Sequence, residues 1–394
     1  MIPDDTRTTK PPETLLDALE VAVTAYPDHV ALKGEGGRGL VFTYSQVLDK
    51  VKRLAAGLQS PEYADLKEIG LLAENRPEWP IAYLGIVASG KIVVPIDANL
   101  KPNEMESIIG HAGVKLLFIS QRFEDQLGRV SDDFKTVLFE DEADNNWERV
   151  MGDPIDFTPI GSRESLASLI YTSGTTGTPK AVMLTHANLI ANLTSIGADL
   201  KFTADDVFLS LLPLHHTFES TCGFLTPLTN GCTVVYARSL KSNQILEDIG
   251  ASGATVMIGV PLLWEKLYQA IRRKIGSAPP VKRAVFRTLF SLSAAGWRVK
   301  KKWGRSLFAD LRQKAGLGSV RMFVSGAAAM PPHISRFFVL LGFDFLQGYG
   351  MTETSPVISA NRPDDIKFGS VGPPLTGVEV KIDNPGEAGI GEII

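Results

Sequence analysis

The sequence predicts an α/β fold in which mostly parallel sheets are covered by helices on both faces, with a smaller β-rich part near the C-terminus. Apolar runs of strand length alternate with segments whose apolar residues recur at helical spacing. This alternation is typical of parallel sheets, because two parallel strands are usually joined by a helix. With 394 residues, the chain can also bury a large core.

The elements follow one another in a regular order. A helix is predicted from Thr14 to just before Pro27, because apolar residues recur at helical spacing until the proline. A short strand and a helix capped at Thr43 or Ser45 follow. Units that pair a strand with a helix are predicted over residues 68–97, 103–120 and 243–261. Residues 371–394 predict a strand, a Pro-Gly-Glu turn and a second strand.

Both ends of the chain carry expectations. The last strand stops at Ile394 without a predicted partner, and an unpaired strand would expose an edge, so we expect the natural protein to continue. Residues 1–13 are polar and contain prolines. We therefore expect a flexible N-terminus over 1–13 and one domain over 14–394.

Composition excludes several classes of function. A net charge of −4 disfavours general nucleic-acid binding. Cys222 and Cys232 form neither a disulfide framework nor a metal-binding spacing, which suits a reducing compartment. The N-terminus lacks the pattern of a signal peptide, and no apolar run is long enough to cross a bilayer. We expect a cytoplasmic protein, either soluble or peripheral to the inner face of a membrane.

Residues 168–186, SLIYTSGTTGTPKAVMLTH, predict a buried strand followed by a loop that holds phosphate. Gly174 and Gly177 allow backbone N–H groups to approach an anion, and the hydroxyl groups around them add donors. Lys180 adds a positive charge. The spacing differs from that of a P-loop, because Pro179 precedes the lysine and Ala181 follows it. A kinase or NTPase of the P-loop type is therefore excluded.

Four segments resemble the motifs of the acyl-adenylate-forming (AMP-binding) superfamily of acyl-CoA synthetases, peptide-synthetase adenylation domains and luciferases. They are YTSGTTGTPKAVMLTH, LLPLHHTFE, FVSGAAAMPP and FLQGYGMTETSP, in the family's order. The family usually has glycine at the position of Ala181. The closest resemblance is to long-chain fatty acid–CoA ligases. Full-length relatives continue into a small C-terminal domain, so the resemblance implies the large N-terminal domain alone, with little adenylation on its own.

The resemblance implies roles for individual residues. Lys180, His216, Thr352 and Glu353 would be catalytic, and Thr172 and Glu353 would hold Mg²⁺, which prefers oxygen ligands. Tyr349 would stack on adenine, and His216 would orient the carboxylate of the acid. The residues implied to bind ATP are Thr172, Ser173, Gly174, Thr175, Thr176, Gly177, Lys180, Gly326, Ala327, Ala328, Gln347, Gly348, Tyr349, Gly350, Met351 and Thr352.

Each of these residues also has an ordinary structural interpretation. Tyr349 could be a half-buried aromatic residue, and Glu353 could be a carboxylate that stabilises a helix N-terminus. SGAAAMPP could be only a tight strand-to-helix connection. A histidine on an apolar segment is more often a core residue than a catalyst. His215 receives no role from the resemblance.

Residues 271–309 contain eleven lysines and arginines and no acidic residue. Apolar residues keep helical spacing on both sides of Pro279 and Pro280, which predicts basic amphipathic helices. Such helices bind anionic membranes. Two alternatives stay open: a solvated basic face whose apolar side packs on the same domain, and a surface that attracts coenzyme A.

The function expected from the resemblance is activation of a carboxylic acid, most simply a long-chain fatty acid. ATP would convert the acid to acyl-AMP in the presence of Mg²⁺, and coenzyme A would then take the acyl group as a thioester. Two other classes stay open: an adenylation domain that loads an acyl or aryl acid onto a carrier protein, and a non-catalytic binder of lipid or nucleotide. Acyl chain length and oligomeric state are not predicted.

Overall fold

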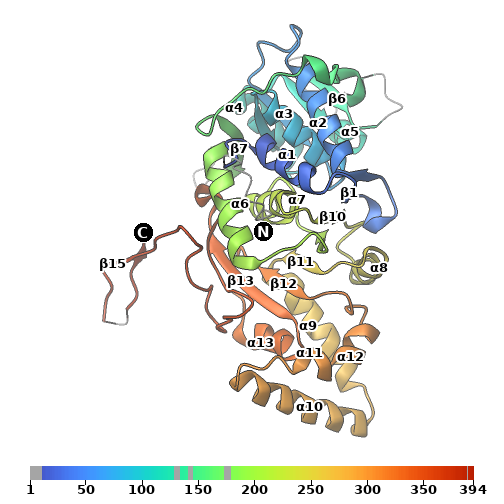
Figure 1. Ribbon diagram of the computed structural model, residues 1–394, viewed down its shortest axis with the longest axis vertical. Helices are drawn as coiled ribbons and strands as arrows, with labels where there is room; N and C mark the ends of the chain where they lie inside the picture. Colours follow the sequence, from blue (N-terminus) through green and yellow to red (C-terminus); the bar gives the residue numbers. More distant parts are fainter. Residues whose placement is uncertain (1–10, 128–133, 141–144, 173–178, 388) are drawn as a thin grey trace.

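The computed structural model describes residues 11–127, 134–140, 145–172, 179–387 and 389–394. Two large sheets form the frame of the molecule. In Figure 1 the six-stranded sheet lies in the upper part and the eight-stranded sheet lies below it. The predicted α/β class with mostly parallel strands is confirmed. Of the N-terminal segment predicted to be flexible, residues 1–10 lie outside the described residues.

The eight-stranded sheet has the strand order β14-β13-β12-β11-β9-β10-β1-β2. Neighbouring strands are parallel except at the two edges, where β2 and β14 run antiparallel to β1 and β13. The strands are β1 (Val30–Lys33), β2 (Val41–Thr43), β9 (Val207–Ser210), β10 (Thr233–Tyr236), β11 (Val256–Gly259), β12 (Met322–Ser325), β13 (Asp344–Gly350) and β14 (Val357–Ala360).

The six-stranded sheet has the order β6-β5-β3-β4-β7-β8 and is parallel except for β8, which folds back on β7 as a hairpin. Its inner strands are covered on both faces, which explains why they are continuous apolar runs. The strands are β3 (Glu68–Leu72), β4 (Ile92–Pro95), β5 (Leu116–Ile119), β6 (Lys135–Leu138), β7 (Leu166–Thr172) and β8 (Lys180–Thr185).

Helices cover both faces of both sheets. The longer ones are α1 (Leu15–Ala25), α2 (Tyr44–Leu58), α3 (Glu78–Ala88), α4 (Pro102–Ala112), α5 (Gln121–Leu127), α6 (His186–Leu200), α8 (Ser242–Ser252), α9 (Pro261–Gly276), α10 (Pro280–Arg298) and α13 (Pro332–Leu340). The short ones are α7 (Thr226–Thr229), α11 (Gly304–Leu307), α12 (Ala309–Lys314), η1 (Glu35–Gly37), η2 (Trp147–Val150), η3 (Pro154–Asp156), the π-helix η4 (Glu219–Leu225) and η5 (Thr352–Thr354).

The largest core cluster joins the two sheets. It combines α1, α2, α3 and α6 with residues of β1 and β10 from one sheet and of β3, β4 and β7 from the other. Every residue of α3 is buried, as expected for a helix that is apolar on all sides. Two further clusters lie under α4 and α5 and under α8, α9 and α13. The cores hold the sheets together, so residues at their strand ends have fixed relative positions.

The predicted starts of the helices at Thr14 and at Thr43 are confirmed, and a third helix begins with the same signal. Thr14 and Thr43 cap α1 and α2 with capping boxes, and Thr185 caps α6 in the same way. In each box the threonine hydroxyl accepts a bond from a first-turn backbone N–H, and a side chain three residues on bonds the cap's own N–H. The sequence therefore located these helix ends correctly from local chemistry alone.

The C-terminal strands show one difference from expectation. β15 (Ile382–Asp383) and β16 (Glu392–Ile393) form a two-stranded antiparallel sheet, which with β14 makes up the β-rich part near the C-terminus. The prediction that the last strand has no partner is wrong, because Lys381 and Ile394 exchange backbone hydrogen bonds of 2.7 and 2.9 Å. A hairpin supplied the partner from within the same segment.

None of the helices in the described part of the chain is both long and apolar enough to cross a bilayer.

Candidate functional site

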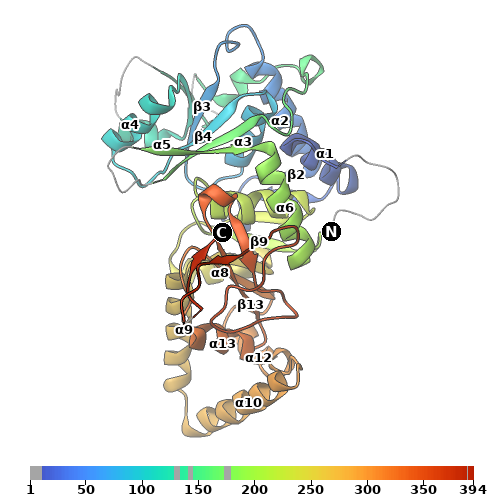
Figure 2. The same ribbon diagram turned by 90° about the vertical axis from the view of Figure 1, so that its left-hand side faces the viewer.

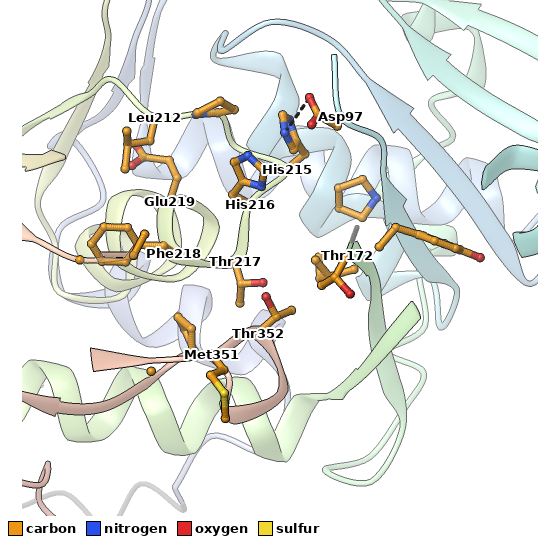
Figure 3. A pocket seen from close by; sticks show the side chains of 18 of the residues that line it. Asp97, Thr172, Leu212, His215, His216, Thr217, Phe218, Glu219, Met351 and Thr352 are labelled. Atoms are coloured by element: carbon orange, nitrogen blue, oxygen red, sulfur yellow. Dashed lines mark ion pairs between the residues drawn. The ribbon is translucent and has the colours of Figure 1, made fainter. Parts of the chain in front are cut away.

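A cavity of about 1050 Å³ lies where strand ends from both sheets meet. Its wall includes residues at or just after the carboxyl ends of β4 and β7 from one sheet, and of β9, β11, β12 and β13 from the other. Ligands of α/β proteins bind at this end of their strands. Figure 3 shows the lining side chains reaching into this space from several segments. All four sequence motifs contribute residues to the wall, and FVSGAAAMPP contributes Gly326 and Ala327.

One side of the cavity is formed by the ends of β12 and β13. Six of the residues predicted to bind nucleotide line it: Gly326, Ala327, Gly348, Tyr349, Gly350 and Met351. Tyr349 is half-buried, so its ring is available to a ligand. Ala328 is exposed and Gln347 is buried, and neither is among the lining residues.

The backbone on this side is closely packed, which explains its small residues. A Cβ atom on Gly350 would lie 1.7 Å from the carbonyl oxygen of Pro356, so only glycine fits. A Cβ on Gly326 would lie 2.7 Å from the ring of Phe218. Ala327 has φ of +67°, a conformation that is uncommon for residues other than glycine. Tight packing and one unusual torsion therefore shape the wall on which a flat ring can lie.

A second side is formed by the β7–β8 hairpin and by η5. Thr172 and Thr352 line the cavity, and in Figure 3 their side chains lie near each other in its middle. Lys180 pairs with Thr172 in the hairpin register and is exposed. Glu353 is exposed on η5, which contacts β8. Lys180 and Glu353 therefore lie on elements beside the cavity, but neither is among the residues that line it. The predicted phosphate-binding residues Ser173, Gly174, Thr175, Thr176 and Gly177 lie outside the described residues.

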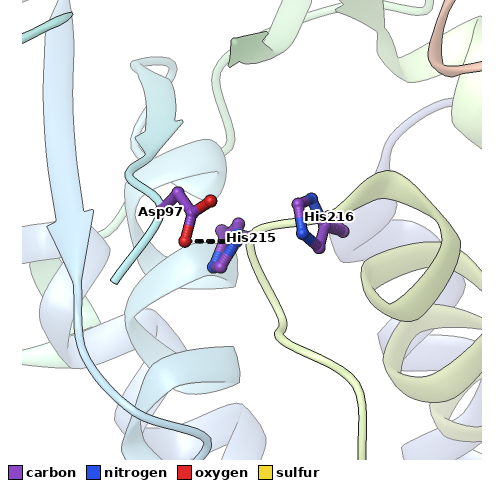
Figure 4. A group of neighbouring side chains, drawn as sticks. All are labelled: Asp97, His215 and His216. Carbon is purple, nitrogen blue, oxygen red and sulfur yellow. Dashed lines mark ion pairs between the residues drawn. The ribbon is translucent and has the colours of Figure 1, made fainter. Parts of the chain in front are cut away.

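A third side carries His215 and His216, which follow β9. Figure 4 shows His215 facing Asp97, which follows β4 in the other sheet. His215 Nε2 lies 3.0 Å from Asp97 Oδ1, without the alignment of a good hydrogen bond. The His215 imidazole and the Asn99 N–H hold the pKa of Asp97 well below its usual range. His215, which has no role from the resemblance, therefore joins the two sheets at the cavity wall.

His216 lines the cavity beside His215 and is the more exposed of the two. Its ring centroid lies 4.2 Å from that of His215, with the planes tilted by 59°. Burial and His215 lower the pKa of His216, and Asp97 acts in the opposite direction. His216 is therefore mostly neutral near pH 7, with a nitrogen available to donate to or accept from an acid.

Donor atoms of Asp97, His215 and His216 lie within 4.8 Å of one another, the one such three-residue group of His, Cys, Asp or Glu in the described ranges. Imidazole nitrogens suit transition metals, whereas Mg²⁺ prefers oxygen. This group therefore differs in chemistry from the predicted magnesium ligands Thr172 and Glu353, which both offer oxygen.

Asn75, which follows β3, fixes the histidine segment. Its Nδ2 donates to the carbonyl oxygen of Leu212 at 2.7 Å and to Ser210 Oγ at 3.2 Å. Its Oδ1 accepts from the N–H of Leu214 at 3.1 Å. One side chain from the six-stranded sheet thus sets the course of the chain that carries His215 and His216.

Glu219 is a fully buried carboxyl group in the cavity wall. Ser210 Oγ donates to its Oε1 at 2.6 Å, and Oε2 has no hydrogen-bond partner among the described residues. Burial raises the pKa of Glu219 to about 8, although the bond from Ser210 acts against this. The group is therefore largely protonated at neutral pH. It starts η4, and such π-helical turns are frequent at functional sites.

Phe218 separates the main cavity from a second, small one. The small cavity has a volume of about 20 Å³ and is lined by carbon-rich groups from α6, η4, β11, β12 and β14. Phe218, Gly348 and Val357 belong to the walls of both cavities.

Sequence reasoning missed Asp97, Asn75, Glu219 and Phe218 as site residues. Asp97 and Asn75 do follow buried strands, at the end of a sheet where ligands bind, so their position was a usable signal. Phe218 and Glu219 lie two and three residues after His216, but nothing in the local sequence distinguishes a buried glutamic acid from an exposed one.

Comparison with known proteins identifies relatives along almost the whole chain. The model of the family described as AMP-binding enzyme matches residues 19–394. Long chain acyl-CoA synthetase 4 of Arabidopsis thaliana is 27% identical over an alignment of 411 positions, which covers 93% of this chain and 61% of the relative. The peroxisomal long chain acyl-CoA synthetase 6 of Arabidopsis thaliana is 30% identical over an alignment of 401 positions, which covers 94% of this chain and 57% of the relative. The chain therefore spans about 60% of the length of these relatives.

Among solved structures, the anthranilate CoA ligase AuaEII in complex with anthranoyl-AMP superimposes with a TM-score of 0.76. The alignment covers 98% of this chain and 67% of the ligase, with 22% sequence identity. At this identity the likeness supports the fold, which is the α/β fold expected from the sequence.

Proposed function

The chain belongs to the AMP-binding enzyme family, and from this premise we propose that it activates a carboxylic acid with ATP. The carboxylate oxygen attacks the α-phosphorus of ATP, the bond to the β-phosphate oxygen breaks, and pyrophosphate leaves with its electron pair. Acyl-AMP then reacts with the thiol of coenzyme A, which forms a thioester and releases AMP. The observation that carries this proposal is that residues of all four motifs line the same large cavity.

On the nucleotide side, Tyr349 would stack on adenine while Gly348 and Gly350 let the base approach the backbone. Thr352 would contact the α-phosphate, and Lys180 would neutralise the charge that develops on pyrophosphate. Two anions repel each other, so fixed donors and a cation at this edge would lower the barrier to their reaction. Residues 173–177 would supply further donors to the β- and γ-phosphates.

The oxygen donors at this edge suit a magnesium ion. Thr172 offers a hydroxyl group and Glu353 a carboxylate, and Mg²⁺ usually completes its six ligands with water and substrate phosphates. Such an ion would shield the negative charge of the phosphates. Exposure of Glu353 and Lys180 fits groups that are neutralised by the ligand rather than by the protein.

On the acid side, His216 would orient the substrate carboxylate. A mostly neutral imidazole can donate one hydrogen bond without trapping the carboxylate as a strong ion pair. Asp97, His215 and Asn75 would hold the segment in place. Glu219, protonated and buried, adds no negative charge to repel the acid.

We further propose a long-chain fatty acid as the substrate. The acid side of the cavity is bordered by Phe218, and the small cavity behind this ring is apolar. This cavity alone is too small for an alkyl chain, so a long chain would extend there only as Phe218 and the apolar residues around it moved apart. The two Arabidopsis relatives are named as long-chain acyl-CoA synthetases, which supports the same choice. The structural neighbour AuaEII is named for anthranilate, so the fold itself does not fix the acid.

The test is calorimetric binding of non-reactive acyl-AMP analogues with two to eighteen carbons. Each buried methylene should add up to about 0.8 kcal/mol until the apolar space is full. A steady rise into the long chains supports both the adenylate site and the long-chain substrate. An early plateau retains acid activation and rejects the long-chain substrate.

Phe218→Ala provides the matched variant. It should move the plateau to longer chains, whereas Phe286→Ala, at a phenylalanine of α10 that lines neither cavity, should not. If no analogue binds and ATP–pyrophosphate exchange is absent with every acid, the proposal of adenylation is wrong. If the acyl group were transferred to a carrier protein instead of coenzyme A, the proposal of acyl-AMP formation would hold and only the proposed acceptor would be wrong.

A further inference from the structure

α10 has two apolar faces, and only one of them is covered by the protein. On the inner face, Phe286 and Phe290 contact Phe308, and Phe290 also contacts Phe337 of α13. Trp297 packs on Phe368. Of the alternatives raised for residues 271–309, packing of an apolar side on the same domain is accounted for by this inner face.

The outer face carries a second stripe of residues with alternating spacings of four and three. It consists of Val281, Val285, Thr288, Leu292, Ala295 and Val299. At 3.6 residues per turn this spacing keeps all six within a narrow band along the helix. Val281, Val285, Leu292 and Val299 are exposed by 74%, 53%, 46% and 61%. No described element covers this band, which we call the α10 stripe.

Trp303 extends the exposed apolar surface at the C-terminal end of α10. A Cβ atom on Gly296 would lie 2.6 Å from the Trp303 ring, so the indole lies directly over the helix at that point. Its exposed fraction is 46%. Tryptophan is enriched where proteins meet the boundary between lipid and water.

The charges around the α10 stripe are all positive. Residues 271–309 hold eleven lysines and arginines and no acidic residue, and among the described residues only Lys302 of these forms an ion pair, with Asp344. Lys282, Arg287 and Arg298 are exposed and lie on the flanks of the stripe, roughly 100–120° around the helix axis. An apolar band with basic flanks is the pattern of helices that lie in a membrane surface.

The position of α10 leaves this face accessible. Figures 1 and 2 both show α10 across the end of the molecule opposite the six-stranded sheet. The helix lies lengthwise along that end, so its stripe can meet a flat surface over its whole length. The cavity lies between the sheets, away from this end.

We propose that the α10 stripe and its basic flanks dock on the surface of an anionic lipid bilayer. The apolar residues lie at the level of the lipid headgroups, and the flanking lysines and arginines contact the lipid phosphates. A second copy of this chain fits less well, because the unpaired positive flanks of two copies would repel each other. The proposal does not depend on catalysis, so it can fail or hold independently of the proposed function.

The first test is co-sedimentation at low salt with vesicles of phosphatidylcholine and phosphatidylglycerol, and with vesicles of phosphatidylcholine alone. The chain should bind the anionic vesicles and bind the neutral ones much less, and salt should weaken the binding. Arg287→Glu with Arg298→Glu should lower the affinity by about 25-fold or more, at about fivefold for each basic residue lost. No binding to anionic vesicles, or equal binding to both kinds, would overturn the proposal.

The apolar part is tested by Val285→Ser with Leu292→Ser, which should lower affinity about tenfold or more without changing charge. Leu40→Ser with Ile155→Ser is the matched control, because both residues are exposed elsewhere. If the two double variants lost vesicle affinity by the same factor, docking through α10 would be contradicted. Thermal unfolding of each variant confirms that it is folded. A concentration-dependent dimer that the stripe variant abolishes, without vesicle binding, would assign the face to a second copy instead.

A fluorescent label gives a readout that does not depend on affinity. Cys222 and Cys232 are buried, so a dye sensitive to polarity can be attached selectively to Leu292→Cys or to Ile155→Cys. Anionic vesicles should shift the emission to the blue at Leu292→Cys and leave that at Ile155→Cys unchanged. No shift at Leu292→Cys in the presence of bound vesicles would mean that another surface docks.

Discussion

The two sides of the cavity are stabilised in different ways. On the phosphate side, Thr172, Lys180 and Glu353 come from one hairpin and one adjoining turn, and the last two are exposed. On the acid side, His215 and Glu219 are buried; His215 faces Asp97 of the other sheet, and Glu219 accepts a hydrogen bond from Ser210, nine residues earlier in the chain. Charged groups on the phosphate side are therefore solvated by water until a ligand binds, whereas buried polar groups on the acid side need partners within the protein. Substitutions on the two sides should consequently differ in kind.

The largest effect is expected from Lys180→Gln on the phosphate side. The rate of acyl-AMP formation, measured by ATP–pyrophosphate exchange, should fall about 10²–10³-fold, as when one transition-state donor is removed. Stability should barely change, because the side chain is exposed. Binding of an acyl-AMP analogue should also be preserved, because the analogue lacks the β- and γ-phosphates.

Lys266→Gln is the matched control, since Lys266 is an exposed lysine on α9. The proposed difference between the two sides would be contradicted if Lys180→Gln lowered the unfolding temperature. It would also be contradicted if the affinity for the acyl-AMP analogue fell by as large a factor as the exchange rate.

The next effect belongs to the acid side and depends on pH. The pKa of Glu219 is raised from its ordinary 4.5 to about 8, so between these values the folded chain holds one proton more than the unfolded chain. The free energy of unfolding should therefore fall by about 1.4 kcal/mol per pH unit as pH rises through this window. Glu219→Gln should remove this contribution, and so gain stability relative to the wild type as pH rises.

Urea unfolding of both proteins from pH 5 to pH 8 measures the difference, and taking the difference cancels contributions from other titrating groups. Glu106→Gln, at an exposed position on α4, reports effects common to any such change. If the free energy of unfolding changed with pH in the same way in the wild type and in Glu219→Gln, the fold would not keep this carboxyl group protonated.

The same contrast explains what could be predicted from sequence. Thr172, Thr352 and the glycines near Tyr349 belong to short continuous motifs whose backbone geometry is set locally, so the sequence located them. Asn75 and Leu214 are 139 residues apart, and their contact exists only because the two sheets pack together. Burial, which sets the pKa of Glu219, likewise depends on the whole fold. The sequence therefore predicted the elements and several motif residues that line the cavity, and missed the residues that hold the histidine segment.

Asn75→Ala tests whether that packing positions the acid side. The change removes two donated bonds and one accepted bond that hold residues 210–214, so stability should fall by about 1–3 kcal/mol. Affinity for acyl-AMP analogues should fall as well, because the segment carries His216. Gln269→Ala removes one exposed contact on α9 and should change neither. Loss of stability with unchanged analogue affinity would mean that Asn75 supports the fold without positioning the histidine.

The smallest effect is the one that reports most directly on the electrostatics of the acid side. Asp97 raises the pKa of His216, against the lowering by burial and by His215. Asp97→Asn keeps the size of the side chain and removes its charge, so the pKa of His216 should fall further below its ordinary value. An NMR titration of the imidazole C–H signals measures this, with His216→Asn used to assign the signal. His186, whose pKa burial lowers to about 4, is the internal reference and should not move. An unchanged His216 pKa in Asp97→Asn would show that the negative charge at position 97 does not act on this ring, and that burial and His215 alone lower its pKa.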